Sequence, residues 1–185
     1  TVIKKNIIQD YNKNGVVVLR DIVPKKWINI LKRGLKKNFQ NPSKYKCVYE
    51  RNNKKELFYD DYCNWNKIEE YKNFIFQSNI GKLAQELMQS KKVNVFHEHV
   101  LVKEIGSTKR TPWHQDQSYY CVNGKDNCSF WIPLDEVSKN SSPEFVIASN
   151  HWNKQFLPTK FFGHSYDKKD GEFQSIPDIE NNRSK

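Results

Sequence analysis

The run VNVFHEHVLVKEIGSTKRTPWHQDQ, residues 93–117, joins an expected β-strand to a short motif of metal-ligand type. Residues 93–104 are rich in β-branched side chains, which favour strands. A loop follows, and then the motif His114-Gln115-Asp116. Because side chains alternate along an extended chain, His114 and Asp116 are expected on the same face. An imidazole and a carboxylate placed in this way supply two of the three ligands of the facial triad that binds Fe(II).

The segments after this motif continue the extended pattern. The strings SFWIPLD at residues 129–135 and EFVIA at residues 144–148 each predict a further strand. A short H-x-D string is common by chance, so its weight comes from this context. A strand, a loop, an H-x-D motif and then more strands is the layout of a metal site in a jelly roll.

On these residues the chain resembles the phytanoyl-CoA dioxygenase family of Fe(II)- and 2-oxoglutarate-dependent oxygenases. The matching segments are GVVVLR (15–20), VKEIG (102–106), TPWHQD (111–116), FWIPLD (130–135) and FVIASNHW (145–152). The resemblance implies an α+β protein with a double-stranded β-helix, or jelly roll, and with N-terminal helices packed on one of its sheets. It also implies a single oxygenase-like domain over residues 1–185.

The first half of the chain carries the helical pattern. Pro24 suits the start of a helix, and apolar residues follow it at helical spacing. The expected elements are a short helix over 2–12 ended by Asn14-Gly15, a strand over 16–19, a helix after Pro24 with Trp27, Leu31, Leu35 and Phe39 on one face, a polar loop over 41–55, a helix over 64–78 capped by Asn64, and a second amphipathic helix over 80–88.

The expected strand at residues 93–104 has two different faces. The polar face holds His97, His99, Leu101 and Lys103, and the apolar face holds Phe96, Val100 and Val102. We expect the apolar face to pack against the helices and the polar face to line the interior of the roll. A buried Lys or His is costly unless it meets an anion or a metal. The resemblance implies 2-oxoglutarate contacts at His99, Lys103 and Trp131. The alternative is that Lys103 lies at a rim and that the histidines are satisfied within the strand.

The family pattern also implies a second iron-binding His and a 2-oxoglutarate-binding Arg on late strands. The last candidates in the chain, His151, His164 and Arg183, stand in other contexts. We therefore expect the late strands to lie beyond Lys185, and the given chain alone to be inactive and to bind metal weakly. His99 could complete a ligand set with His114 and Asp116, but the family takes its third ligand from a late strand.

Composition limits the possible functions. The chain has 185 residues, 37% of them hydrophobic and 14% aromatic, which suits one globular domain with a core. Its formal net charge of +10 suggests a nucleic-acid-binding protein. The lysines are scattered, however, and no nucleic-acid-binding motif occurs, so we expect no nucleic-acid partner.

The cysteines indicate a cellular compartment. Cys47, Cys63, Cys121 and Cys128 form no C-x-x-C motif and no zinc-like spacing. The chain has no signal-peptide pattern and no apolar run of membrane length. We therefore expect reduced thiols in a cytoplasmic protein with no membrane partner.

The resemblance and the motif together predict an Fe(II)- and 2-oxoglutarate-dependent dioxygenase that uses O2 to hydroxylate a small organic substrate. Halogenating relatives carry a small residue where Asp116 stands, so a carboxylate there favours hydroxylation. Two alternatives stay open: a non-catalytic jelly-roll binding protein and, with less support, a basic nucleic-acid-binding protein.

Overall fold

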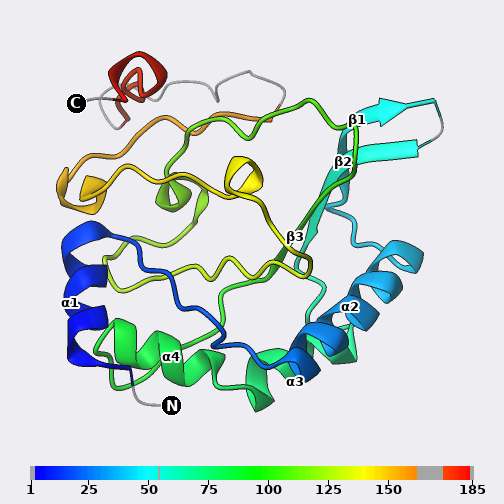
Figure 1. The fold of residues 1–185 in the computed structure, drawn as a ribbon, viewed down its shortest axis with the longest axis horizontal. Coiled ribbons are helices and arrows are strands. Elements are labelled where there is room, and N and C mark those ends of the chain that lie inside the picture. Colours follow the sequence, from blue (N-terminus) through cyan, green and yellow to red (C-terminus); the bar gives the residue numbers. More distant parts are fainter. Residues whose placement is uncertain (1–2, 54, 162–172, 184–185) are drawn as a thin grey trace.

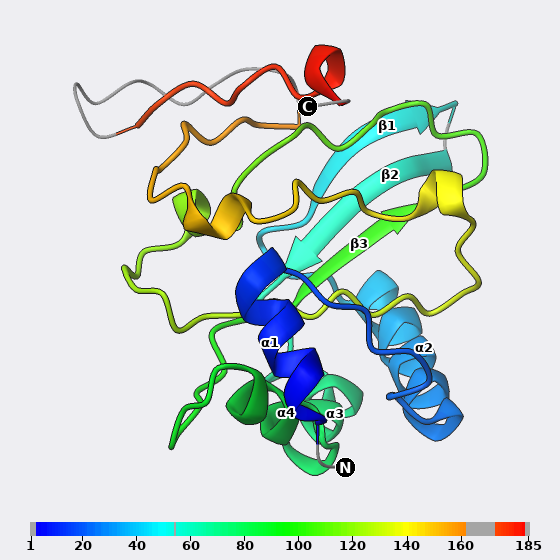
Figure 2. The ribbon, with the colours of Figure 1, turned by 60° about the vertical axis from the view of Figure 1, so that its left-hand side comes forward.

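A three-stranded antiparallel sheet lies between a group of helices and a long irregular region of extended chain (Figures 1 and 2). The computed structural model describes residues 3–53, 55–161 and 173–183. The regular elements are α1 (Lys5–Asn14), α2 (Lys25–Gln40), β1 (Cys47–Asn52), β2 (Lys55–Tyr62), α3 (Glu69–Gln77), α4 (Ile80–Leu87) and β3 (His99–Lys103). Single 3-10 turns interrupt the extended chain after β3, at Asp116–Tyr119, Lys139–Ser141, Ser149–His151 and Glu180–Asn182.

The predicted end of the first helix is confirmed. Gly15 caps α1 in the left-handed conformation, with φ 77°, and its N–H donates to the carbonyl of Tyr11 at 2.8 Å. A side chain at this position would also collide with Asn150, whose Oδ1 would stand 2.8 Å from a Cβ. A glycine is therefore needed both for the cap and for the close approach of the segment that carries Asn150.

Helix α2 starts after Pro24 as expected, but it buries a different face near its end. Its buried residues are Trp27, Leu31, Gly34 and Asn38, whereas Phe39 is 45% exposed. At Gly34 an added Cβ would lie 2.6 Å from the ring of Tyr71, so this glycine lets α2 approach α3 closely. Trp27 and Leu31 join Ile68, Tyr71 and Phe74 in the main core.

The region expected to be a polar loop contains most of a β-hairpin. Strands β1 and β2 pair antiparallel from Cys47 opposite Asp60 to Asn52 opposite Lys55. Asn53, at the turn, has a positive φ of 53°, a conformation that asparagine adopts more readily than most residues. The loop prediction is wrong because β1 exposes polar side chains at its end and shows no apolar alternation.

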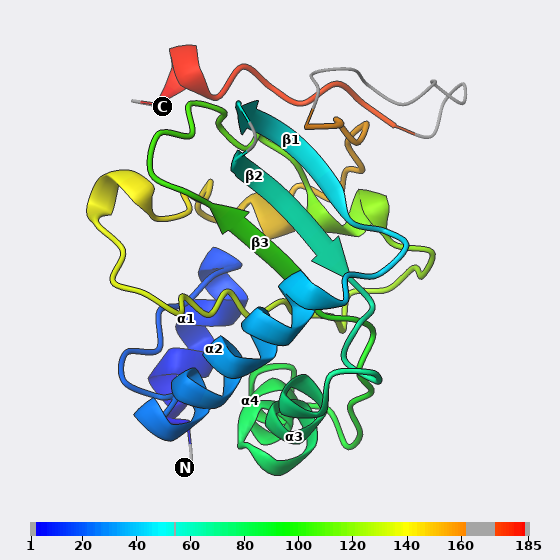
Figure 3. The same cartoon turned by 90° about the vertical axis from the view of Figure 1, so that its right-hand side faces the viewer.

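The sheet presents one face to the helices and one to the irregular region (Figure 3). Val100 of β3 packs on the helical core, and the buried carboxylate of Asp61 accepts a hydrogen bond of 2.8 Å from Asn38 of α2. On the other face, Phe58 stands opposite Lys103, and the ring of Phe161 packs on Phe58 at 5.2 Å between centroids.

Several expected strands are not formed in the described part of the chain. The strand predicted over residues 93–104 is limited to His99–Lys103, and the segments 16–19, 129–135 and 144–148 belong to no sheet. The described residues therefore confirm an α+β protein but do not confirm a jelly roll. No helix in the three described ranges combines the length and apolar character needed to cross a membrane.

Candidate metal centre

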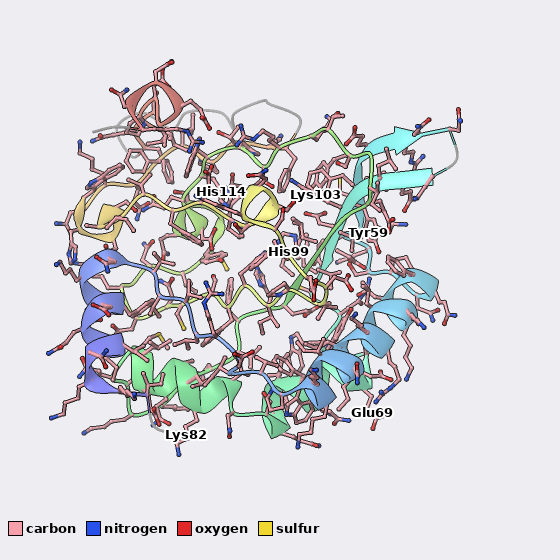
Figure 4. All side chains as sticks on the ribbon, viewed as in Figure 1. Tyr59, Glu69, Lys82, His99, Lys103 and His114 are labelled. Atoms are coloured by element: carbon pink, nitrogen blue, oxygen red, sulfur yellow. The ribbon has the colours of Figure 1, made fainter. Side chains whose placement is uncertain are left out.

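His114 and Asp116 lie side by side, as the alternation of an extended chain predicts. Nε2 of His114 is 3.1 Å from Oδ1 of Asp116. Gln115, between them, has extended dihedral angles, with φ −114° and ψ 120°, which turn both neighbouring side chains to the same side. Asp116 then begins the 3-10 turn Asp116–Tyr119. His114 is labelled in Figure 4, on the extended chain beyond β3.

Each of the two groups is oriented by a further contact. Nδ1 of His114 is 2.8 Å from the carbonyl oxygen of Pro112, which can only accept, so Nδ1 carries the proton in the neutral ring. Oδ2 of Asp116 accepts a hydrogen bond of 3.1 Å from the hydroxyl of Ser129. Metal-ligating His and Asp residues are usually fixed by such contacts from carbonyls and donors behind them.

The two side chains also influence each other's protonation. The hydrogen bond to Asp116 raises the pKa of His114 above its usual value, although burial opposes the shift. The same contact lowers the pKa of Asp116, with help from Ser129. The raised pKa favours the protonated imidazolium of His114, so Nε2 must lose its proton before it can bind a metal, whereas the lowered pKa of Asp116 keeps its carboxylate in the metal-binding form.

This pair fits two positions of an iron site. Adjacent octahedral ligands, each about 2.1 Å from a metal, stand about 3 Å apart. The distance of 3.1 Å between Nε2 of His114 and Oδ1 of Asp116 agrees with that spacing. Among residues 3–53, 55–161 and 173–183, no group of three or more His, Cys, Asp or Glu side chains is arranged to hold a metal ion.

Gln115 connects the motif to a distant segment of chain. Its Nε2 donates to the carbonyl of Lys154 at 3.1 Å, and its Oε1 accepts from the N–H of Phe156 at 3.0 Å. Tyr119 makes a similar connection, because its hydroxyl both donates to the carbonyl of Thr159 and accepts from its N–H. These side chains link the two segments in place of a backbone ladder, a role that their sequence pattern does not indicate.

Glu50 of β1 holds the loop that leads to the motif. Its carboxylate accepts from the hydroxyl of Ser107 at 2.6 Å, from the N–H and hydroxyl of Thr108, and from the N–H of Lys109 at 3.2 Å. These hydrogen bonds, that of Ser107 first, lower the pKa of Glu50 to about 2. The sequence offers no signal for this contact, because Glu50 is separated from Thr108 by 58 positions.

Lys103 lies on the polar face of β3 and donates to the same loop. Its Nζ is 3.1 Å from the carbonyl oxygen of Lys109 and 3.1 Å from Oγ1 of Thr111. The ammonium group also stands 4.5 Å from the centroid of the Phe58 ring. Burial lowers the pKa of Lys103, and Arg110 adds to the effect.

His99 is held by a buried acid that the sequence analysis did not single out. Nε2 of His99 is 2.9 Å from Oδ2 of Asp60, and the hydroxyl of Tyr49 donates to the same oxygen at 2.9 Å. Asp60 is only 3% exposed, and its Oδ1 has no hydrogen-bond partner among the residues that the structure describes. His99 is therefore engaged with Asp60 and does not join the His114 pair as a ligand. Figure 4 shows His99 and Lys103 along β3.

The two faces of the predicted strand are confirmed only within β3. Val100 packs on the helical core as predicted, but His99, Leu101 and Lys103 are exposed on the other side, so the prediction that this face lines a buried interior is wrong for β3. Phe96 is an error of the prediction: it precedes β3, is 49% exposed, and packs against His97 and Tyr120 instead of the helices.

The remaining candidates lie apart from the metal pair. Trp131 is 53% exposed and follows Ser129 by two residues in the same extended segment. His151 has its Nε2 at 3.1 Å from the carbonyl of Lys13, at the end of α1, in agreement with a structural role. His164 lies outside the described residues. Arg183 pairs with two glutamates and is described below.

Comparison with known proteins identifies the family of the chain. A sequence model of the family described as phytanoyl-CoA dioxygenase (PhyH) matches residues 11–183. Searches of curated proteins and of solved structures find no match. The family match includes the His114–Asp116 pair, β3 and all the helices except part of α1. The chain belongs to the phytanoyl-CoA dioxygenase family.

Proposed function

We propose that the protein is an Fe(II)- and 2-oxoglutarate-dependent dioxygenase that hydroxylates a small organic substrate. The family is of the Fe(II)- and 2-oxoglutarate-dependent oxygenase kind. The observation that carries the proposal for this chain is the contact of 3.1 Å between His114 and Asp116, together with the carbonyl behind Nδ1 of His114.

His114 and Asp116 would hold the iron. Bound Fe(II), with 2-oxoglutarate and O2, supplies the oxidising chemistry that converts the co-substrate to succinate and CO2 and delivers an oxygen atom to the substrate. Pro112 keeps the proton of the neutral His114 ring on Nδ1, so that Nε2 is the nitrogen that would act as a ligand. Ser129 orients the carboxylate of Asp116. Because that carboxylate occupies the position at which halogenating relatives bind halide, we assign hydroxylation.

We assign the co-substrate contacts to Lys103, His99 and Trp131. Lys103 is the strongest of the three, since an ammonium group has three N–H donors and, among the described residues, two acceptors contact it. Partial burial lowers the pKa of Lys103, although the residue is exposed on the polar face of β3. A carboxylate of 2-oxoglutarate would therefore favour the charged form of the lysine.

A reducing compartment suits this chemistry, because the iron must stay as Fe(II). All four cysteines are free thiols. We therefore place the protein in the cytoplasm, where thiols are kept reduced.

The experiment is a turnover assay on the full-length protein with Fe(II), ascorbate, O2 and 2-oxoglutarate, in which succinate is measured. We expect succinate to form, and the Asp116→Ala variant to form none, because a ligand is lost. The matched control is Asp135→Asn, which removes an exposed ion pair with Lys32. Normal turnover by Asp116→Ala would refute the assignment. Metal binding without turnover in the wild type would favour the non-catalytic binding protein instead.

A further inference from the structure

Trp113, the residue before His114, contacts a cluster of charged residues that the oxygenase mechanism does not use. Its indole Nε1 donates to Oε1 of Glu180 at 2.9 Å. The guanidinium carbon of Arg183 lies 5.9 Å from the centroid of the Trp113 ring, within the range of a cation–π contact. The side chain next to the metal pair is therefore held by a segment that follows it by 67 positions.

Arg183 links this glutamate to another part of the chain. Its Nε donates to Oε2 of Glu180 at 2.8 Å. Its two terminal nitrogens donate to the two carboxylate oxygens of Glu144, at 3.0 and 2.9 Å. Such a forked pair is the strongest geometry that arginine makes with a carboxylate. The contacts with Arg183 and Trp113 lower the pKa of Glu180 to about 2.

The segment that carries these residues is ordered by its own contacts. Asp178 accepts from the N–H of Asn181 at 3.1 Å and from its side-chain amide at 2.6 Å. These hydrogen bonds lie beside the 3-10 turn Glu180–Asn182, and Arg183, which follows the turn, pairs with Glu180 three positions before it. Arg110, in the loop before the motif, completes the cluster at 3.8 Å from Glu144.

We propose that Glu180 and Arg183 are positioning residues for the metal pair: with Glu144 they form a charged latch that fixes Trp113 and, through it, His114. The latch joins the loop at Arg110, the extended segment at Glu144 and the turn at Glu180–Asn182. Its members are about half exposed, so salt should weaken it. The guanidinium of Arg183 is committed to the latch and is not a co-substrate contact.

The role of these residues in metal binding rests on the proposed function, but their effect on the position of Trp113 can be tested without metal. Amide hydrogen exchange is measured on the metal-free protein at about 20 mM and about 500 mM NaCl. For Arg183→Gln at low salt, we expect exchange in residues 111–119 to be roughly three- to tenfold faster than in the wild type, because the variant loses two exposed ion pairs and the cation–π contact with Trp113 together. High salt should accelerate these amides in the wild type and should have little further effect in the variant.

Further variants separate the latch from a general loss of stability. Arg183→Lys keeps the charge but loses the fork, so it should give a smaller acceleration. Asp135→Asn, which removes the separate ion pair with Lys32, should leave residues 111–119 unchanged. Unchanged exchange in Arg183→Gln would overturn the proposal, and so would an equal acceleration in α3 and β2.

A second measurement connects the latch to the metal. Co(II) titration of the full-length protein should show weaker binding by Arg183→Gln, again by roughly three- to tenfold. Unchanged Co(II) affinity together with faster exchange would overturn the positioning role. The two proposals can fail separately: loss of turnover in the wild type would not alter the exchange result, and a failed latch would leave the Asp116→Ala result intact.

Discussion

Replacing Lys103 separates two roles that the structure gives to one ammonium group. The group donates to the carbonyl of Lys109 and to Oγ1 of Thr111, both at 3.1 Å, and so it anchors the loop before the metal pair. Its third N–H is the one we assign to 2-oxoglutarate. A charge-assisted hydrogen bond contributes about 1–3 kcal/mol, so Lys103→Ala should weaken co-substrate binding by roughly 5- to 150-fold.

The assay is an anaerobic titration of the Fe(II)-loaded, full-length protein with 2-oxoglutarate, followed by the metal-to-ligand absorption band. Thr111→Val is the matched control, because it removes one loop acceptor and leaves the lysine charge in place. We expect Thr111→Val to keep the wild-type midpoint. Lys103→Met should resemble Lys103→Ala in affinity, because its side chain still covers Phe58 but carries no charge.

An unchanged midpoint in Lys103→Ala would refute the reasoning and would make Lys103 a loop anchor only. A midpoint that moves equally in Thr111→Val and Lys103→Ala would also refute it, because the loop, and not the charge, would then control affinity. Loss of metal binding in Lys103→Ala is measured separately by Co(II) titration, so that a displaced loop is not mistaken for a lost contact.

Three further predictions concern the support of the site. The pKa of Glu50 is lowered to about 2, so its stabilisation of the loop should be complete above its usual pKa of 4.5 and should be lost as the pH falls towards 2. The NMR chemical shift of the Thr108 amide should follow this titration, and Glu50→Gln should abolish it. Asp61→Ala removes a fully buried carboxylate that accepts from two buried asparagine amides and a serine, and should lower the free energy of unfolding in urea by about 2–4 kcal/mol. Gln115→Leu removes the hydrogen bonds to Phe156 and its neighbouring segment, and should cost about 1–3 kcal/mol in the same assay and weaken Co(II) binding.

The helices were predictable because burial there follows a single period. Helix α4, Ile80–Leu87, buries Leu83 and Leu87, which stand four positions apart, as the pattern indicated. Two details differ from the prediction: Asn38 is buried and Phe39 exposed at the end of α2, and α3 begins at Glu69, so that Asn64 does not cap it. Asn38 can occupy the core because its side-chain amide donates a hydrogen bond to the carboxylate of Asp61. Asp61 lies 23 positions away, so the helical pattern of the sequence does not predict this contact.

The extended half of the chain was harder to predict. An apolar string such as residues 144–148 indicates extended chain, but it does not show whether a partner strand is present. In the described structure Ala148 donates its N–H to the carbonyl of Asn14, at the end of α1, and not to a strand. Extended geometry at Gln115 was still enough to place His114 beside Asp116, because that depends on two dihedral angles only.

The polar face of β3 shows why residue type alone did not rank the co-substrate contacts. His99 and Lys103 were equal candidates in sequence, since both are basic and both point to the same side. Nε2 of His99 lies 2.9 Å from the buried carboxylate of Asp60. The nearest acceptors of Lys103 are instead an uncharged carbonyl and a hydroxyl. An incoming carboxylate would meet repulsion from Asp60 directly beside His99, whereas beside Lys103 it would meet both Glu50 and the opposite charge of Arg110. Lys103 should therefore contribute most of the attraction, with Nδ1 of His99 as a weaker second donor.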